Sequence, residues 1–129
     1  IVYAFVLKGF QNIIVFNRSK KIIKFKEVKT FTKNYSLIDK HLHDADLIIN
    51  TTPTNPLKKK QMHIVGHKTV VSDIVYKPKL TVFLKEFKEN RKIYGISMLI
   101  EQAIPCFRFW FGFNPKVDET LLKKLNTKI

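Results

Sequence analysis

Short apolar segments alternate along this chain with longer segments in which apolar residues recur every three or four positions. The short segments are rich in β-branched residues and predict five strands, at 12–16, 28–32, 47–50, 69–74 and 92–94. The longer segments predict helices at 1–8, 20–26, 36–43, 80–89, 97–111 and 118–126. Alternation of strands with helices is typical of βαβ units, so we expect an α/β fold with a mostly parallel sheet that is covered on both faces.

The first predicted element is a helix, which is unusual for a fold of this class. In a Rossmann-like, doubly wound parallel sheet the first strand lies at the centre and leads into a glycine-rich phosphate loop. Without that strand, the strands at 12–16 and 47–50 would each keep an unpaired edge. Because the chain also begins with Ile1 and not with Met, we expect it to be part of a longer protein. We do not expect these residues alone to form a native sheet.

A basic segment follows the first predicted strand. Asn17, Arg18 and Ser19 come directly after the apolar run, and Lys20 and Lys21 follow them. At the end of the second strand of a dinucleotide fold, an acidic residue holds the ribose of NAD, whereas an Arg accommodates the 2'-phosphate of NADP. The segment therefore indicates an NADP site, with a solvated basic turn as the alternative.

Polar residues or a glycine also follow three later strands. Asn50 and Thr51 close the strand at 47–50, Tyr76 follows the strand at 69–74, and Gly95 follows the strand at 92–94. Ligands of doubly wound sheets bind outside the carboxyl ends of the strands, so these positions predict a ligand cleft. A plain Asn-Thr-Pro turn and a packed tyrosine before a proline are the structural alternatives. In the helix that follows, Met98 is most simply a core residue and Gln102 a surface amide.

Taken in this order, the four segments resemble the carboxyl-terminal NADP-binding domain of the shikimate dehydrogenases. The resemblance covers essentially the whole chain and is carried by Asn17-Arg18-Ser19, the segment 45–53, Asp73, Tyr76, Pro78, Gly95, Met98, Leu99, Gln102, Ala103, Phe107 and Trp110. It implies an oxidoreductase that reversibly reduces 3-dehydroshikimate to shikimate with NADPH. That reaction belongs to the pathway to chorismate and the aromatic amino acids.

The resemblance also implies roles for the matching residues. The 2'-phosphate would be held by Asn17, Arg18, Ser19 and Lys21. The cofactor cleft would be lined by Asn50, Thr51, Gly95 and Met98, and the substrate would be contacted by Tyr76 and Gln102. The family's catalytic Lys and Asp lie in its amino-terminal substrate domain. We therefore expect no catalytic residue in this chain, no activity from it alone, and helices at 97–111 and 118–126 that pack back toward that domain.

Four features depart from the family pattern. The glycine-rich phosphate loop is absent, Ile22 stands where a second basic residue is usual, and Asn55 stands where a glycine is usual. Asn tolerates a left-handed backbone best among residues with a side chain. Pro105 falls inside a predicted helix, where it would cost about 3 kcal/mol unless the helix kinks. The last two departures make an inactive remnant of the enzyme one alternative. A quinate/shikimate dehydrogenase is another, because substrate preference in the family depends largely on the amino-terminal domain.

Composition and charge limit the classes of protein to which the chain can belong. The formal net charge of +14 raises the possibility of a small basic nucleic-acid-binding module, but only three of the 24 basic residues are Arg and the lysines are scattered. The His41–His43 and His63–His67 pairs have no third ligand in the pattern, so no metal is expected. Cys106 is the single cysteine, which excludes an internal disulfide. No uncharged stretch approaches the roughly 18 residues of a membrane span, so we expect a cytoplasmic protein with no membrane partner. A small-molecule substrate is what the resemblance implies.

Overall fold

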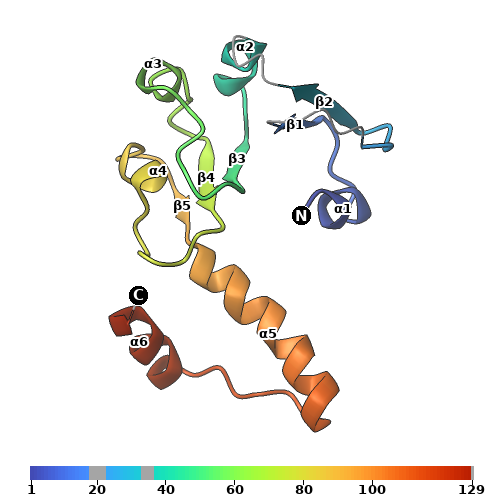
Figure 1. Cartoon of the computed structure of the whole chain (residues 1–129), viewed down its shortest axis with the longest axis vertical. Coiled ribbons are helices and arrows are strands. Elements are labelled where there is room, and N and C mark those ends of the chain that lie inside the picture. The colour runs from blue at the N-terminus through green and yellow to red at the C-terminus, as the bar shows by residue number, and fades with distance from the viewer. Residues whose placement is uncertain (18–22, 33–36, 129) are drawn as a thin grey trace. The chain divides into compact units, whose positions relative to one another are not determined.

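The structure is a computed structural model that describes residues 1–17, 23–32 and 37–128, without the side chains of residues 31 and 32. It divides into two compact units, Ile1–Leu42 and His43–Ile129, which are considered separately. The elements, labelled in Figure 1, are α1 (Val2–Leu7), β1 (Ile13–Asn17), β2 (Val28–Thr32), α2 (Asp39–Leu42), β3 (Leu47–Asn50), α3 (Lys59–Met62), β4 (Val70–Asp73), α4 (Val82–Lys85), β5 (Lys92–Ile93), α5 (Gly95–Phe111) and α6 (Glu119–Lys128).

The first unit is built around a parallel pair of strands. β1 and β2 pair from Ile13 opposite Val28 to Asn17 opposite Thr32. Between α1 and this pair, Gly9 has a φ of 78°, in the left-handed region that glycine adopts without strain. The reversal lets Phe10 pack edge-on against Phe5, with ring centroids 4.9 Å apart.

The second unit contains a parallel sheet of three strands in the order β3-β4-β5. β4 is the central strand, and its Val71 is fully buried. α4 packs against β4 and contributes the buried side chains of Phe83 and Leu84, followed by Phe87. Since each fully buried apolar side chain of this size contributes about 1.5–3 kcal/mol, this cluster is the core of the unit.

The parallel α/β class predicted from the alternating pattern is confirmed, and all five predicted strands are present. β1 and β3 lie in separate sheets, in line with the expectation that these two strands do not pair directly. β2 and β3 have the predicted bounds, and the ends of β1, β4 and β5 differ from the predicted ones by at most one residue, as is usual where element ends fray.

The helices were predicted less well. The predicted helix at 20–26 is wrong for its described part, because residues 23–25 have no regular structure and Val28 N–H bonds back to Phe25 O at 3.0 Å. The helices predicted at 36–43 and 80–89 shorten to α2 and α4. Beyond α4, the backbone N–H groups of Glu86 and Phe87 bond three residues back, so the apolar face continues in a tighter turn.

Two findings concern helices that the sequence pattern predicted wrongly or not at all. No helix was predicted between residues 43 and 80, but α3 begins there at Lys59. Gln61 explains this, because its buried side chain accepts the Lys58 N–H at 2.9 Å and closes the first turn. α5 begins at Gly95 rather than at 97 and runs through Pro105 without ending. The carbonyl that loses its helical partner belongs to Glu101, an exposed residue, so water can take the place of the missing N–H.

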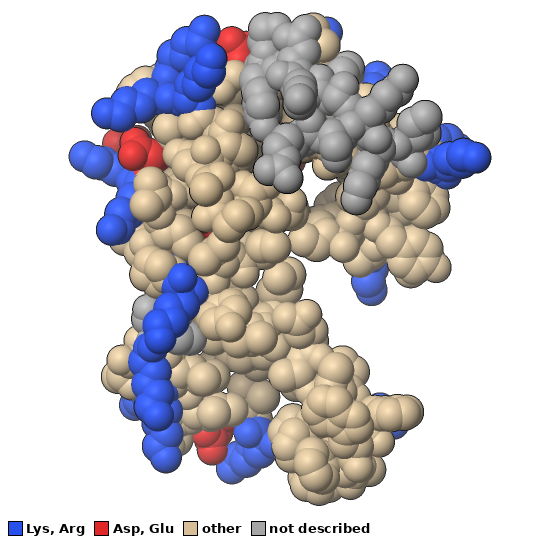
Figure 2. Space-filling model, in the orientation of Figure 1, with Lys and Arg blue, Asp and Glu red and all other residues tan. Residues whose placement is uncertain are grey.

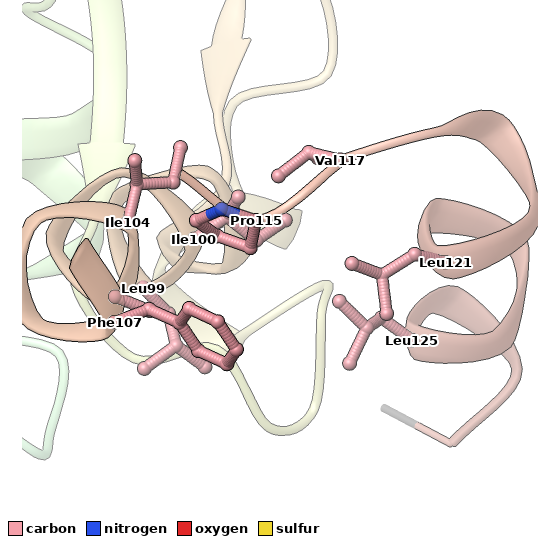
Figure 3. Close-up of a pocket in the computed structure, with 9 residues that line it drawn as sticks. Leu99, Ile100, Ile104, Phe107, Pro115, Val117, Leu121 and Leu125 are labelled. Atoms are coloured by element: carbon pink, nitrogen blue, oxygen red, sulfur yellow. The ribbon is translucent and has the colours of Figure 1, made fainter. Parts of the chain in front are cut away.

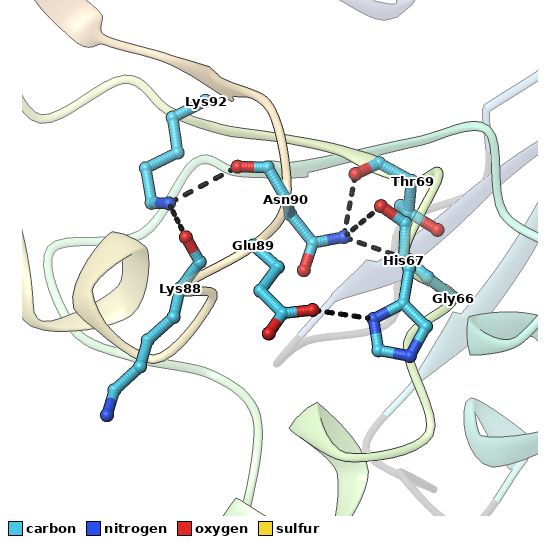
Figure 4. Close-up of polar contacts among 7 residues, drawn as sticks. All are labelled: Gly66, His67, Thr69, Lys88, Glu89, Asn90 and Lys92. Atoms are coloured by element: carbon cyan, nitrogen blue, oxygen red, sulfur yellow. Dashed lines mark hydrogen bonds and ion pairs between the residues drawn. The ribbon is translucent and has the colours of Figure 1, made fainter.

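At the amino end of β4, Asn90 joins two loops, as Figure 4 shows. Its Nδ2 donates to the carbonyls of Gly66 at 2.8 Å and Thr69 at 2.9 Å, and lies 3.4 Å from that of His67. Lys92 Nζ bonds the carbonyl of Asn90 itself at 3.2 Å. The Asn90 amide therefore ties the loop before β4 to the loop before β5.

We predict that Asn90→Ala destabilises the protein by about 1–3 kcal/mol, because two backbone carbonyls lose their donor. The measurement is the midpoint of urea unfolding of the full-length protein, with Lys88→Ala as the control. Lys88 is exposed and bonds Lys92 through its backbone carbonyl only, so its side chain can be removed without breaking a bond. An Asn90→Ala midpoint equal to that of the control would contradict the bridge.

Candidate nucleotide site at the carboxyl ends of the strands

The three strands of the second unit end along one edge of their sheet. Asn50, the last residue of β3, lies opposite Asp73, the last residue of β4. Ile93, the last residue of β5, lies opposite Ser72. Because the strands are parallel, the segments that carry Thr51, Tyr76 and Gly95 all leave from this edge. The structure therefore brings three of the four predicted strand-end segments together.

Asn50 is buried at this edge, with 2% of its surface exposed. Its Nδ2 donates to Thr54 O at 3.1 Å and to Asp73 Oδ2 at 3.3 Å. Its Oδ1 accepts from the Thr52 backbone N–H at 2.9 Å and lies 2.7 Å from the Thr52 hydroxyl. All four hydrogen-bonding positions of the amide thus have protein partners. In this structure Asn50 shapes the turn after β3, and its predicted contact with a cofactor stays a prediction.

Asp73 is the second buried polar residue of the edge, with 1% of its surface exposed. Its Oδ2 accepts from the hydroxyl of Thr81 at 2.6 Å as well as from Asn50. Its Oδ1 accepts from the Val75 backbone N–H at 3.0 Å. Thr81 in turn accepts the Leu84 N–H at 3.2 Å and caps α4. One carboxyl group therefore joins β3, the segment after β4 and the start of α4.

Gly95 lies where α5 meets the end of β4. A Cβ atom added to Gly95 would lie 2.5 Å from Ile74 O and 2.7 Å from Val75 O, closer than real Cβ atoms approach a backbone oxygen. Only glycine fits at this approach of two backbones. The sequence favoured a glycine that a ligand approaches, and the structure adds that the protein's own backbone already requires it.

The other predicted ligand residues of this unit are accessible at their surface. Thr51 and Gln102 are exposed, and Tyr76 and Met98 keep 43% and 37% of their surface exposed. Met98 and Gln102 are four residues apart on α5 and share one face of that helix. These side chains can contact a ligand without breaking a bond inside the protein core.

The predicted 2'-phosphate residues belong to the first unit. Asn17 is the last residue of β1 and is half-buried. Arg18, Ser19 and Lys21 lie outside the described residues. Their predicted contacts with the 2'-phosphate therefore stay predictions.

The structure corrects one expectation and adds one network. Asn55 was considered for a left-handed backbone, but within the described residues the only non-glycine with positive φ is Asn12. Asn55 instead accepts the Leu57 N–H at 3.0 Å through its side chain.

The Asn50–Asp73–Thr81 network was not predicted from the sequence. Thr81 before the apolar Val82 and Phe83 is a helix-capping signal that points to part of it.

The described residues were also compared with the requirements of a metal site and of a membrane-spanning helix. No group of three His, Cys, Asp or Glu side chains in this part of the chain is arranged to hold a metal ion. None of its helices has both the length and the apolar character needed to cross a membrane.

An apolar hollow of about 300 Å³ lies between α5 and α6, shown in Figure 3. It is lined by aliphatic and aromatic side chains and by Pro115, and includes Leu99, Ile104, Phe107, Leu121 and Leu125. It offers no charged partner for a phosphate, so it is distinct in chemistry from the strand-end edge.

A parallel α/β sheet whose carboxyl edge carries polar side chains defines the Rossmann-like class of nucleotide-binding folds. Solved structures of similar fold support this class. Quinate dehydrogenase from Corynebacterium glutamicum in complex with NAD matches 99% of this chain and 50% of its own, with a TM-score of 0.77 and 22% identity. Shikimate dehydrogenase from Aquifex aeolicus matches 97% of this chain and 47% of its own, with a TM-score of 0.71 and 26% identity.

Sequence similarity identifies the particular group within that class. Shikimate dehydrogenase (NADP(+)) of Bartonella tribocorum is 35% identical over 136 residues, which cover 94% of this chain and 47% of the relative. No protein-family model matches the chain. The chain is therefore a homologue of the shikimate dehydrogenases, which confirms the resemblance predicted from its motifs. It spans about half the length of the curated relatives it matches.

Proposed function

We propose that this chain is the NADP-binding part of a shikimate dehydrogenase, which reversibly reduces 3-dehydroshikimate to shikimate in the cytoplasm. The observation that carries the proposal is the 35% identity to a shikimate dehydrogenase (NADP(+)) over 94% of the chain. The carboxyl edge of the β3-β4-β5 sheet supports it, because this edge gathers the segments of Thr51, Tyr76 and Gly95. The catalytic groups would come from the part of the relatives that this chain does not match.

The residues at the edge suit a dinucleotide. Exposed hydroxyl and amide groups at the carboxyl ends of parallel strands are the donors and acceptors that ribose and nicotinamide require. When bound, NADPH supplies the hydride. Thr51 and Met98 would contact the cofactor, while Asn50 and Gly95 would hold the backbone that the cofactor passes.

Substrate contact would fall to Tyr76 and Gln102. A phenol can donate to a hydroxyl or a carboxylate, and an amide can both donate and accept. The substrate carries ring hydroxyls and a carboxylate, which these two side chains can bind. Because both side chains are exposed, each can contact a substrate without a rearrangement of the core.

We further propose that α5 and α6 pack against the remainder of the full-length enzyme. Large aromatic side chains at the end of α5 are strongly exposed in this chain, with Phe109 at 87%, Trp110 at 72% and Phe113 at 60%. Exposed apolar surface of this kind marks an interaction site. The relatives are about twice as long as the matched region, so their remaining half is the partner we assign to it.

The basic surface does not alter this proposal. On the face shown in Figure 2, the Lys and Arg side chains form several groups, one of which is a stripe at the lower left. Only three of the 24 basic residues are Arg, the residue that binds phosphate in a bidentate manner and reads base edges. We therefore propose no nucleic-acid partner for this protein.

We predict that the full-length protein binds NADPH more tightly than NADH and that Arg18→Ala removes most of this difference. Loss of a charge-assisted hydrogen bond of about 1.5–3 kcal/mol corresponds to roughly a ten- to hundredfold weaker binding of NADPH. NADH binding should change less than about twofold, because NADH has no 2'-phosphate. Fluorescence titration measures both, with Arg91→Ala as the control for loss of a positive charge. Equal weakening of NADPH and NADH would remove Arg18 from the 2'-phosphate site.

We also predict that Phe109→Glu lowers the melting temperature of the full-length enzyme. A side chain that stays exposed would tolerate this change within about 0.5 kcal/mol. Burial of an unpaired carboxylate and loss of a buried ring would cost about 3 kcal/mol or more. Val82→Glu, at an apolar position on α4 that is 67% exposed, is the matched control, because it makes the same change from an apolar side chain to a carboxylate outside α5 and α6. Equal melting temperatures for the two variants would contradict packing on α5.

A further inference from the structure

We propose that Asp73 is a positioning residue that sets the geometry of the cofactor and substrate contacts at the strand-end edge. The inference deepens the proposed function and rests on it. Asp73 ends the central strand of its sheet, and 1% of its surface is exposed. A buried carboxyl group needs several hydrogen bonds to offset the loss of water, and here each of them reaches a different segment of the edge.

The first segment held by Asp73 is the turn after β3. Asp73 Oδ2 accepts from Asn50 Nδ2 at 3.3 Å, which orients the Asn50 amide with its oxygen toward Thr52. The same amide donates to Thr54 O at 3.1 Å. Thr51, the predicted cofactor contact, lies between these anchored positions. Its place therefore depends on Asp73 through Asn50.

The second segment is the chain after β4. Asp73 Oδ1 accepts from the Val75 N–H at 3.0 Å, one residue before the predicted substrate contact Tyr76. Val75 also lies against Gly95, since a Cβ on Gly95 would be 2.7 Å from Val75 O. The bond from Asp73 thus fixes the backbone on which both Tyr76 and the start of α5 depend.

The third contact of Asp73, with Thr81, sets the direction of the hydrogen bonds in the network. The Thr81 hydroxyl donates to Asp73 Oδ2 at 2.6 Å and accepts the Leu84 N–H at 3.2 Å. A hydroxyl has one proton to donate and two lone pairs that accept, so the Thr81 hydroxyl can accept the Leu84 N–H and donate its proton to the Asp73 oxygen at the same time. An asparagine at position 73 would set its NH2 group against Asn50 Nδ2 and the Thr81 hydroxyl in one orientation, and against the Val75 N–H in the other. Asp73→Asn therefore disrupts the network in either orientation while keeping side-chain size.

Asn90 provides the comparison that separates positioning from stability. Its amide also joins two loops, with bonds of 2.8 and 2.9 Å to backbone carbonyls. It lies before β5 and bonds residues before β4, at the amino ends of the strands. Loss of Asn90 should therefore lower stability without moving Thr51 or Tyr76.

The test compares kinetics and stability of Asp73→Asn and Asn90→Ala in the full-length protein. The measurements are kcat/KM with NADPH, kcat/KM with 3-dehydroshikimate, and the melting temperature. We expect Asp73→Asn to lower both kcat/KM values roughly ten- to hundredfold, the scale of small displacements of bound groups. Asn90→Ala should keep both within about twofold despite a lower melting temperature. Equal kinetics for the two variants would overturn the inference.

A second pair of variants, at Thr81, tests the role of Asp73 if Asp73→Asn does not fold. Thr81→Ser keeps the hydroxyl that bonds Asp73, and Thr81→Val removes it at nearly constant volume. We expect Thr81→Ser to retain wild-type kcat/KM and Thr81→Val to lose severalfold. Equal values for the two Thr81 variants would overturn the inference. A wild-type protein without NADPH-dependent activity on 3-dehydroshikimate would overturn the proposed function itself, and with it this inference.

Discussion

The parallel register of β3 and β4 is the constraint on which the rest of the second unit depends. It places Asn50 opposite Asp73 at the last pair of the ladder. An amide and a carboxyl group that meet there without water must bond each other and their neighbours, because an unsatisfied buried polar group costs about 1–3 kcal/mol. A shift of one strand by one residue would separate the two groups and place them on opposite faces of the sheet.

This register also determines what can lie around the edge. Because Asp73 is held by Asn50, Val75 and Thr81, the chain after β4 follows one path, and that path passes so close to Gly95 that no side chain fits there. α5 therefore starts directly on the end of β4. The buried polar groups are used to fix the backbone, which leaves the exposed Thr51, Tyr76, Met98 and Gln102 for a ligand.

Strands and strand-end positions could be predicted from the sequence because β-branched apolar runs specify both an element and where it ends. The short helices could not. α3 depends on the hydrogen bond from the Lys58 N–H to Gln61, which the spacing of apolar residues does not predict. The segment at 23–26 forms no helix although its residues permit one. The motif match placed Asp73 at the edge but assigned it no role, since its three partners come from separate parts of the chain and become neighbours only in the folded sheet.

Amide hydrogen exchange of the full-length protein, with and without NADPH, tests the proposal that a dinucleotide binds along the carboxyl ends of β3, β4 and β5. We expect added protection at residues 51–54 and 74–77, and none at residues 66–69 and 88–91 at the amino ends of the same strands. Protection of the amino-end loops without protection at 51–54 and 74–77 would show that the dinucleotide binds elsewhere.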